Sequence, residues 1–242
     1  MAGVPPGRSI GQRFLDLFIA PSRAFVAPRP VAMLWIGLAL IAAVQLLDAV
    51  LLHDLQAARQ LQMTERILDR DQNLAADKKA EVLAKAEENS RGTRAVALEA
   101  ISRIVAIGIL GVLLPAALLL FGVNFGFAGR ARFIDTLIVT TFSYLVTVPR
   151  DAILIPLRRL TGTLDIYAGP AVLSSPDSGL LFYVLMMFDL FDLYHLVPLA
   201  LGLALVGGIS RGKAWTLVLI FWGVWVLFTI GMASLAVSMG VA

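Results

Sequence analysis

The fold is decided by one stretch, FDLFDLYHLVPLALGLALVGGISRGKAWTLVLIFWGVWVLF, at residues 188–228. Two long apolar runs are joined there by the five-residue basic turn SRGKA. A soluble domain cannot cover that much apolar surface, whereas the hydrocarbon core of a bilayer can. The stretch therefore predicts a transmembrane hairpin closed by a short, positively charged loop.

The composition extends this interpretation to the whole chain. Of its 242 residues, 59% are hydrophobic and 15% are charged, whereas an average soluble domain has about 25% charged residues. We therefore expect an all-α polytopic membrane protein. The chain contains no cysteine, which excludes disulfides, thiolate metal sites and cysteine nucleophiles.

Five apolar segments have the length and composition of membrane-spanning helices. They form one expected membrane domain, residues 31–242, with spans at residues 31–52, 104–121, 133–148, 191–208 and 214–237. Pro115 falls inside the second span, and Pro198 is expected to bend the fourth. The third span is more polar because of its threonines and serine, and Asp135 at its entry can pair with Arg132, three residues earlier. Residues 180–188 are expected to lie in the membrane interface as a separate helix.

Residues 1–30 are expected to be a cytoplasmic segment with one amphipathic helix. Arg13 and Asp16 lie off its apolar face. A short basic helix of this kind suits the membrane interface, and packing of the same face on the protein itself is the alternative. The apolar face consists of Ile10, Phe14, Leu17 and Phe18.

Residues 53–103 form a polar excursion between the first two spans. They hold nine basic and nine acidic residues and are rich in helix formers. We expect an extracytoplasmic pair of helical arms that continues the adjoining spans, turns near residues 71–73 and is interrupted near Gly92. Asp48 is expected at the outer interface. The later connection, residues 149–178, is rich in proline and glycine and is expected to be irregular or interfacial.

The distribution of Lys and Arg predicts the orientation. The N-terminal segment and the loops at residues 124–132 and 209–213 hold eight basic residues and one acid, whereas the other connections hold twelve of each sign. Short basic segments stay in the cytoplasm. We therefore expect a multi-pass protein of the cytoplasmic (inner) membrane, with its N-terminus in the cytoplasm and its C-terminus outside.

Three ionisable residues, Asp189, Asp192 and His195, follow one another at intervals of three. Two carboxylates and an imidazole can bind a cation or relay a proton. On one helix, however, each step of three residues rotates the side chain, so that only neighbouring pairs converge. The simpler interpretation is a polar entry into the interface, and we expect no metal or cofactor site.

Residues 208–212 match the G-x-S-x-G pattern of hydrolases around Ser210. That motif needs a strand–turn–helix context with a partner histidine and an acid. Ser210 falls instead in a turn between two membrane helices, so we expect a polar turn. An intramembrane hydrolase is the weakest alternative. The basic residues are dispersed, which leaves no footprint for nucleic acid.

The opening stretch resembles the signature of bacterial Yip1-domain membrane proteins. That family has an aromatic entry, an aliphatic span with an internal glycine, and a Ser-Arg/Lys-Lys-Ala turn into the last span. The N-terminal FLDLFIAPSRAFVAPRP is similar to the family's F-x-x-P-x-x-A-F entry. Tyr194 stands where tryptophan is commoner, and Pro198 is an addition. The matching positions are Phe191, Tyr194, Gly202, Ser210, Arg211, Lys213 and Ala214.

This resemblance implies a five-span integral membrane protein with no enzymatic activity, catalytic residue or cofactor. Eukaryotic relatives resemble trafficking factors, and some bacterial relatives are associated with transport machinery. We therefore expect a scaffold or accessory of such machinery, with the lipid bilayer and other membrane proteins or further copies of the chain as partners. The alternative is a small transporter or channel subunit that uses Asp189, Asp192 and His195.

Overall fold

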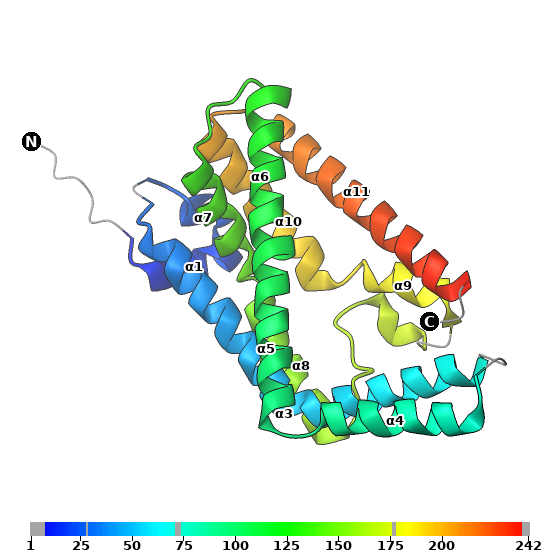
Figure 1. The fold of residues 1–242 in the computed structure, drawn as a ribbon. Coiled ribbons are helices and arrows are strands. Elements are labelled where there is room, and N and C mark those ends of the chain that lie inside the picture. Colours follow the sequence, from blue (N-terminus) through cyan, green and yellow to red (C-terminus); the bar gives the residue numbers. More distant parts are fainter. Residues whose placement is uncertain (1–7, 28, 71–73, 176–177, 239–242) are drawn as a thin grey trace, which may run out of the picture. The chain divides into compact units, whose positions relative to one another are not determined.

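The computed structural model describes the whole chain except residues 1–7, 28, 71–73, 176–177 and 239–242. Its described part is helical and contains no strand (Figure 1). Five of its helices are long and apolar enough to cross a membrane: Ala32–Arg70, Thr93–Gly126, Phe133–Thr161, Leu190–Gly207 and Arg211–Leu235. The prediction of an all-α chain with five apolar helices of membrane-spanning length is confirmed.

Internal contacts divide the chain into two compact units, which we describe separately. The first consists of Met1–Ala42, Ala106–Pro149 and Phe191–Val224. The second consists of Ala43–Val105, Arg150–Leu190 and Trp225–Ala242. Several long helices begin in one unit and end in the other.

The first unit has the buried core of the protein. It contains the short helices α1 and α2, the beginning of α3, the segments η1, α6 and η2 of the second span, the helix α7, most of α10 and the beginning of α11. Their bounds are Ile10–Ile19 (α1), Pro21–Ala24 (α2), Ala32–Arg70 (α3), Ile107–Leu113 (η1), Leu114–Phe121 (α6), Gly122–Gly126 (η2), Phe133–Tyr144 (α7), Leu190–Gly207 (α10) and Arg211–Ser238 (α11).

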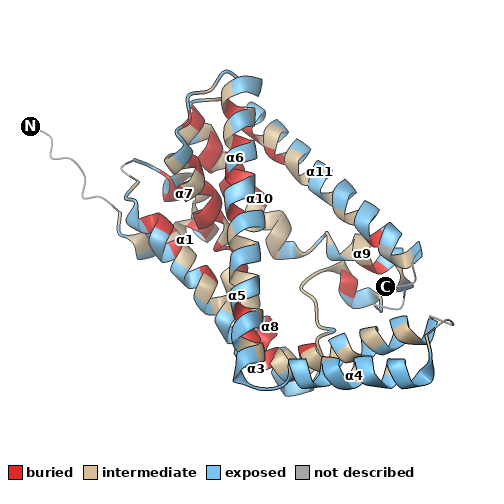
Figure 2. Cartoon of the chain, viewed as in Figure 1, coloured by how far each residue is buried: buried red, intermediate tan, exposed pale blue. Residues whose placement is uncertain are grey.

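Helix α7 is the most deeply buried part of this unit (Figure 2). Its hydroxyl-bearing residues, which made the third span look unusually polar, are inside the protein. Thr140 Oγ1 donates to the carbonyl oxygen of Thr136 at 3.0 Å, and Thr136 Oγ1 donates to that of Arg132 at 3.1 Å. Such bonds let a threonine occupy a buried membrane helix, because its hydroxyl is satisfied by its own backbone.

Pro115 is accommodated by a local change of helix type. Its ring would crowd the carbonyl four residues earlier, and it lacks an N–H. The second span widens into the π-helical segment η1 just before this point, and Pro115 then lies in the first turn of α6. The following Gly122 packs closely, since a Cβ there would lie 2.4 Å from Cδ1 of Leu217, whereas Gly126 has nothing within 4 Å.

The second unit contains the polar excursion and the later connection. Helix α4 ends at Ser90, and the next helix begins at Thr93 after Gly92 with φ +89°. The predicted interruption near Gly92 is confirmed, and the turn expected at residues 71–73 lies outside the described residues. The elements that this unit adds are α4 (Ala76–Ser90), α5 (Thr93–Ala106), α8 (Thr147–Thr161), η3 (Pro170–Leu173) and α9 (Leu180–Met186).

The structure corrects the interpretation of residues 149–178. The first part is the helix α8, because Pro149 lies in its first turn, where no intrahelical N–H bond is needed. Pro156 is tolerated within the same helix. The chain leaves the helix at Gly162, whose φ is +68°. Helix α9 occupies the stretch that was expected to form a separate helix before the fourth span.

Candidate functional site

The two stretches that carry the family resemblance pack against each other in the first unit. The hydroxyl of Tyr194, in α10, donates to the carbonyl oxygens of Leu17 at 3.0 Å and Phe18 at 3.1 Å. These carbonyls belong to the last turn of α1, where no intrahelical donor is left for them. The Tyr194 ring also stacks on Phe18, with centroids 6.3 Å apart. Tyr194 therefore caps α1 and holds it against α10.

Gly202 provides the space in which the N-terminal segment fits. A Cβ at this position would lie 2.5 Å from Cγ1 of Val139 and 3.0 Å from Cδ2 of Phe25. Phe25 is fully buried and meets Phe142 edge-on, with ring centroids 6.4 Å apart. The glycine inside the fourth span thus lets α7, α10 and the N-terminal segment approach closely, as small residues do in membrane helix bundles.

Arg13 departs from its expected position off the packed face of α1. Its side chain is buried, and Nη1 donates to the carbonyl oxygens of Ala24 and Val26, each at 2.9 Å. Nε donates to the carbonyl oxygen of Arg8 at 3.3 Å. The guanidinium has five donors in a rigid fork, so it joins three separate points of the N-terminal segment. Burial of Arg13 is favourable here because these backbone acceptors replace water.

The other end of the N-terminal segment is fixed by an ion pair. Arg29 Nε lies 3.1 Å from Asp135 Oδ1, in the first turn of α7, and Arg29 Nη1 donates to the carbonyl oxygen of Phe25 at 3.0 Å. From the sequence, Arg132 was the expected partner of Asp135 because it lies three residues earlier. The structure pairs Asp135 with Arg29 instead, across a long sequence separation.

Removing the Tyr194 hydroxyl should weaken this docking measurably. Tyr194→Phe keeps the ring and leaves two carbonyls of α1 without their donor, a loss of about 1 kcal/mol. We expect the melting temperature of the purified protein in detergent to fall by roughly 2–4 °C. The matched control is Tyr183→Phe in α9, whose ring packs on Phe182. Equal shifts in the two variants would contradict the capping role.

Ser210 is the N-cap of α11. Its Oγ accepts from the backbone N–H of Lys213 at 3.3 Å, and its carbonyl oxygen accepts from that of Ala214 at 3.1 Å. A hydroxyl at this position satisfies one of the free N–H groups of the helix start. Arg211 and Lys213 are exposed in the same first turn. The expected polar turn between the last two spans is confirmed.

Asp192 and His195 lie in α10, Asp192 in its first turn, and Asp189 directly precedes this helix. Asp189 belongs to the second unit, where its Oδ1 lies 3.6 Å from Arg150 Nη1. In the first unit, His195 Nε2 is buried without a hydrogen-bond partner, and the ring meets Tyr144 edge-on with centroids 5.9 Å apart. Phe191, half-buried, packs on the core of that unit. Among the described residues, no three carboxylate or imidazole groups form a metal-ligand set.

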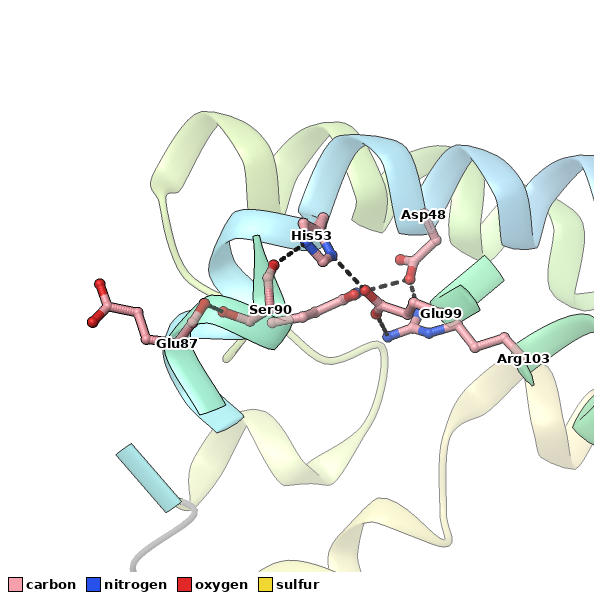
Figure 3. Close-up of polar contacts among 7 residues, drawn as sticks. Asp48, His53, Glu87, Ser90, Glu99 and Arg103 are labelled. Atoms are coloured by element: carbon pink, nitrogen blue, oxygen red, sulfur yellow. Dashed lines mark hydrogen bonds and ion pairs between the residues drawn. The ribbon is translucent and has the colours of Figure 1, made fainter. Parts of the chain in front are cut away.

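The second unit contains a polar network that sequence reasoning did not find (Figure 3). His53, in α3, contacts both of the following helices. Its Nδ1 lies 2.7 Å from Glu99 Oε2 in α5, and its Nε2 lies 2.8 Å from the carbonyl oxygen of Ser90 at the end of α4. A backbone carbonyl and an ionised carboxylate can only accept hydrogen bonds. Both contacts are therefore hydrogen bonds only when both ring nitrogens of His53 carry protons. The imidazolium is the form that fits.

Arg103 completes the network by holding two carboxylates. Its Nη2 lies 2.8 Å from Glu99 Oε1, and its Nη1 pairs with Asp48. Asp48 also accepts from Gln56 Nε2 at 2.9 Å. One sequence signal could have found this pair: Asp48 closes the first span and Arg103 opens the second, so antiparallel spans bring the two charges to the same level. The charges satisfy one another, which favours a structural role.

Two further ion pairs join α3 to the end of α8 and the segment after it. Asp54 Oδ2 lies 2.5 Å from Arg159 Nη1, and Arg59 Nη2 lies 2.6 Å from Asp165 Oδ1. The Tyr167 hydroxyl donates to the same Asp165 oxygen at 2.8 Å. Burial raises the pKa of Tyr167, which therefore stays a neutral donor at physiological pH. The polar residues of this unit are thus used to fasten the excursion to the later connection.

Comparison with known protein families, with curated proteins and with solved structures gives no match to this chain. The resemblance to Yip1-domain proteins therefore rests on the residues quoted above. The structure adds that Tyr194, Gly202 and Ser210 each make a defined contact: a cap, a close approach and an N-cap.

Proposed function

We propose that this chain is a non-catalytic, Yip1-like integral membrane protein that serves as a scaffold or accessory partner of membrane transport or trafficking machinery. The observation that carries the proposal is the mutual packing of the two signature stretches. Tyr194 caps α1, and Gly202 makes room for Phe25. Residues that match the family's motif are engaged in holding the N-terminal segment on the bundle. This packing role of the motif residues supports a protein that acts by binding other molecules and not by catalysis.

The proposed arrangement has five spans in the cytoplasmic membrane, the N-terminus inside and the C-terminus outside, with α1 in contact with lipid. The end of α3, α4 and the beginning of α5 form the extracytoplasmic excursion. Two observations support it. The exposed Arg211 and Lys213 lie in the turn between the last two spans, and α4 has no buried residue, as expected for a helix in water.

Single cysteines test the orientation directly, because the natural chain has none. Lys213→Cys, in the turn between the last two spans, should react with a membrane-impermeant maleimide only in inside-out vesicles. Lys85→Cys, exposed in α4, should react only in right-side-out vesicles. The reverse pattern would invert the proposed topology, and reaction of both positions from the same side would contradict the five-span arrangement.

The scaffold role is tested by recovering partners from the native membrane. The tagged chain is purified in mild detergent, and co-purifying proteins are quantified by mass spectrometry against Tyr194→Phe, which weakens the docking of α1 and keeps the ring. We expect transport or trafficking components to be enriched with the natural chain and reduced with the variant. Recovery of no partner would count against the scaffold. Labelling of Ser210 by a serine-reactive probe would contradict a non-catalytic protein.

A small transporter or channel subunit is the second candidate. The observation that favours it is the buried Nε2 of His195, which has no hydrogen-bond partner within an apolar helix, because ionisable groups in spans often mark ion or substrate pathways. Flux into liposomes should then fall in His195→Gln and in Asp192→Asn. Unchanged flux in both variants would remove these residues from any transport mechanism.

A further inference from the structure

The N-terminal segment follows α7 and α10 over much of their length. The end of α10 lies beside the residues that precede α7, since the Arg130 N–H donates to the carbonyl oxygen of Gly207 at 3.0 Å. We call this the turn end of the two helices, and the N-terminal segment reaches it at Arg29. Arg29 pairs with Asp135 close to this end. Phe25 packs further along, at Gly202, and the end of α1 lies at Tyr194. All of these contacts lie within the first unit.

The depth of α1 follows from the rise of α10. Tyr194 precedes Gly207 by thirteen residues in one continuous helix. At 1.5 Å per residue, Tyr194 lies about 20 Å from the turn end of α10, and Gly202 about 8 Å from it. The hydrocarbon core of a bilayer is about 30 Å thick. If α10 crosses the membrane, the end of α1 lies well inside the hydrocarbon layer and not on its surface.

The side chains of α1 suit such a position. On the face of α1 that is turned away from the protein, Leu15 is 58% exposed and Ile19 is 80% exposed. Their i,i+4 spacing places both side chains on that same face. Two arginines of the segment are satisfied internally, Arg13 by backbone carbonyls and Arg8 by Asp16, whereas Arg23 in α2 is exposed and has a stem long enough to extend its charge toward water. Charged residues at membrane depth are tolerated when they face the protein and pair in this way.

The irregular backbone after α2 is covered by protein at Phe25, which is fully buried, whereas Val26 is 48% exposed. Non-helical backbone is found at membrane depth only where protein covers it or its polar groups are satisfied. The carbonyl oxygens of Ala24 and Val26 are bonded to Arg13. The exposed apolar surface also continues into the beginning of α3, where Trp35 is 66% exposed.

We propose that α1, α2 and residues 25–27 form a re-entrant element of the membrane domain, and that Leu15 and Ile19 contact lipid acyl chains. This differs from the surface helix expected from the sequence. It rests on the spans of the proposed function and is independent of any partner. Arg13 is the residue that makes the turn within the membrane feasible, because its N–H groups occupy the carbonyl oxygens of Ala24 and Val26.

Spin labels test this depth in the full-length protein. Ile19→Cys and Leu15→Cys each receive a nitroxide, and the protein is reconstituted in liposomes. Collision with oxygen, which concentrates in lipid, and with a water-soluble nickel chelate is then measured. Ile220→Cys, 58% exposed on α11, is the lipid reference. Lys213→Cys, in the turn between the last two spans, is the aqueous reference.

We expect positions 15 and 19 to behave as position 220 does, with high collision rates for oxygen and low rates for the chelate. Chelate accessibility comparable with position 213 would place α1 on the membrane surface and overturn the proposal. Low accessibility to both reagents would also overturn it, since protein would then cover the face. Because both positions are exposed, labelling should leave folding intact, and agreement between the two sites guards against a local distortion.

Discussion

Gly202→Leu is expected to prevent the N-terminal segment from docking and to destabilise the first unit severely. The first carbon of the new side chain would already lie 2.5 Å from Cγ1 of Val139, and the rest would meet the fully buried Phe25. Overpacking of a filled core costs about 1–3 kcal/mol, occasionally more, and a side chain as large as leucine is at the upper end. We expect loss of monodisperse protein in detergent, measured by size-exclusion chromatography and thermal unfolding.

The matched control is Gly223→Leu, in the apolar helix α11, where an added Cβ has nothing within 4 Å. That variant should elute and melt like the natural protein. A rescue separates the clash from a loss of helix flexibility: Gly202→Ala should destabilise, and Val139→Ala in the same chain should restore much of the loss. Similar behaviour of the variants at positions 202 and 223 would contradict the packing argument.

Arg103→Ala is expected to loosen the second unit. The substitution leaves Asp48 and Glu99, whose side chains are only 13% and 17% exposed, without their shared cation. The contact with Asp48 is a charge-assisted hydrogen bond, which contributes about 1.5–3 kcal/mol, and the contact with Glu99 is an ion pair. Water reaches Arg103, so we expect a total near that range. The melting temperature in detergent should fall by roughly 5 °C, and hydrogen exchange should rise at the beginning of α5.

Arg91→Ala provides the comparison, because its i,i+4 pair with Glu87 is 75% and 50% exposed. Such surface pairs contribute at most about 1 kcal/mol. Adding Asp48→Asn to Arg103→Ala should recover part of the lost stability, since it removes one uncompensated charge. If Arg103→Ala and Arg91→Ala melt alike, the network of Figure 3 does not stabilise the unit.

Sequence patterns predicted the elements well where a single periodicity or residue type dominates. Long apolar runs predicted the five helices, and Gly92 and the 209–213 turn predicted where helices end. Residues 149–161 were expected to be irregular or interfacial because the connection is rich in proline and glycine, and the structure shows that they are helical. Pro149 lies in the first turn of α8, where proline is tolerated. Local composition does not reveal which turn of a helix a proline will occupy.

Partnerships across long separations could not be predicted. Asp135 was expected to pair with Arg132 by proximity in sequence, but it pairs with Arg29. His53, Glu99 and Arg103 belong to the polar excursion, where a solvated face and a partly buried network have the same residue types. The spacing of Asp189, Asp192 and His195 in the sequence did not reveal that His195 Nε2 is buried without a hydrogen-bond partner.

By itself, the sequence determined that this protein is helical, apolar and long enough to cross a membrane five times, because hydropathy depends on composition and length alone. Tertiary structure alone decided the role of the stretch at residues 188–228 and of its N-terminal counterpart. Tyr194 and Gly202 in the first stretch, and Arg13 just before the second, serve to fold α1 and α2 against the bundle. The physical reason is that caps and close approaches depend on which helices are neighbours, and a one-dimensional pattern does not contain that information.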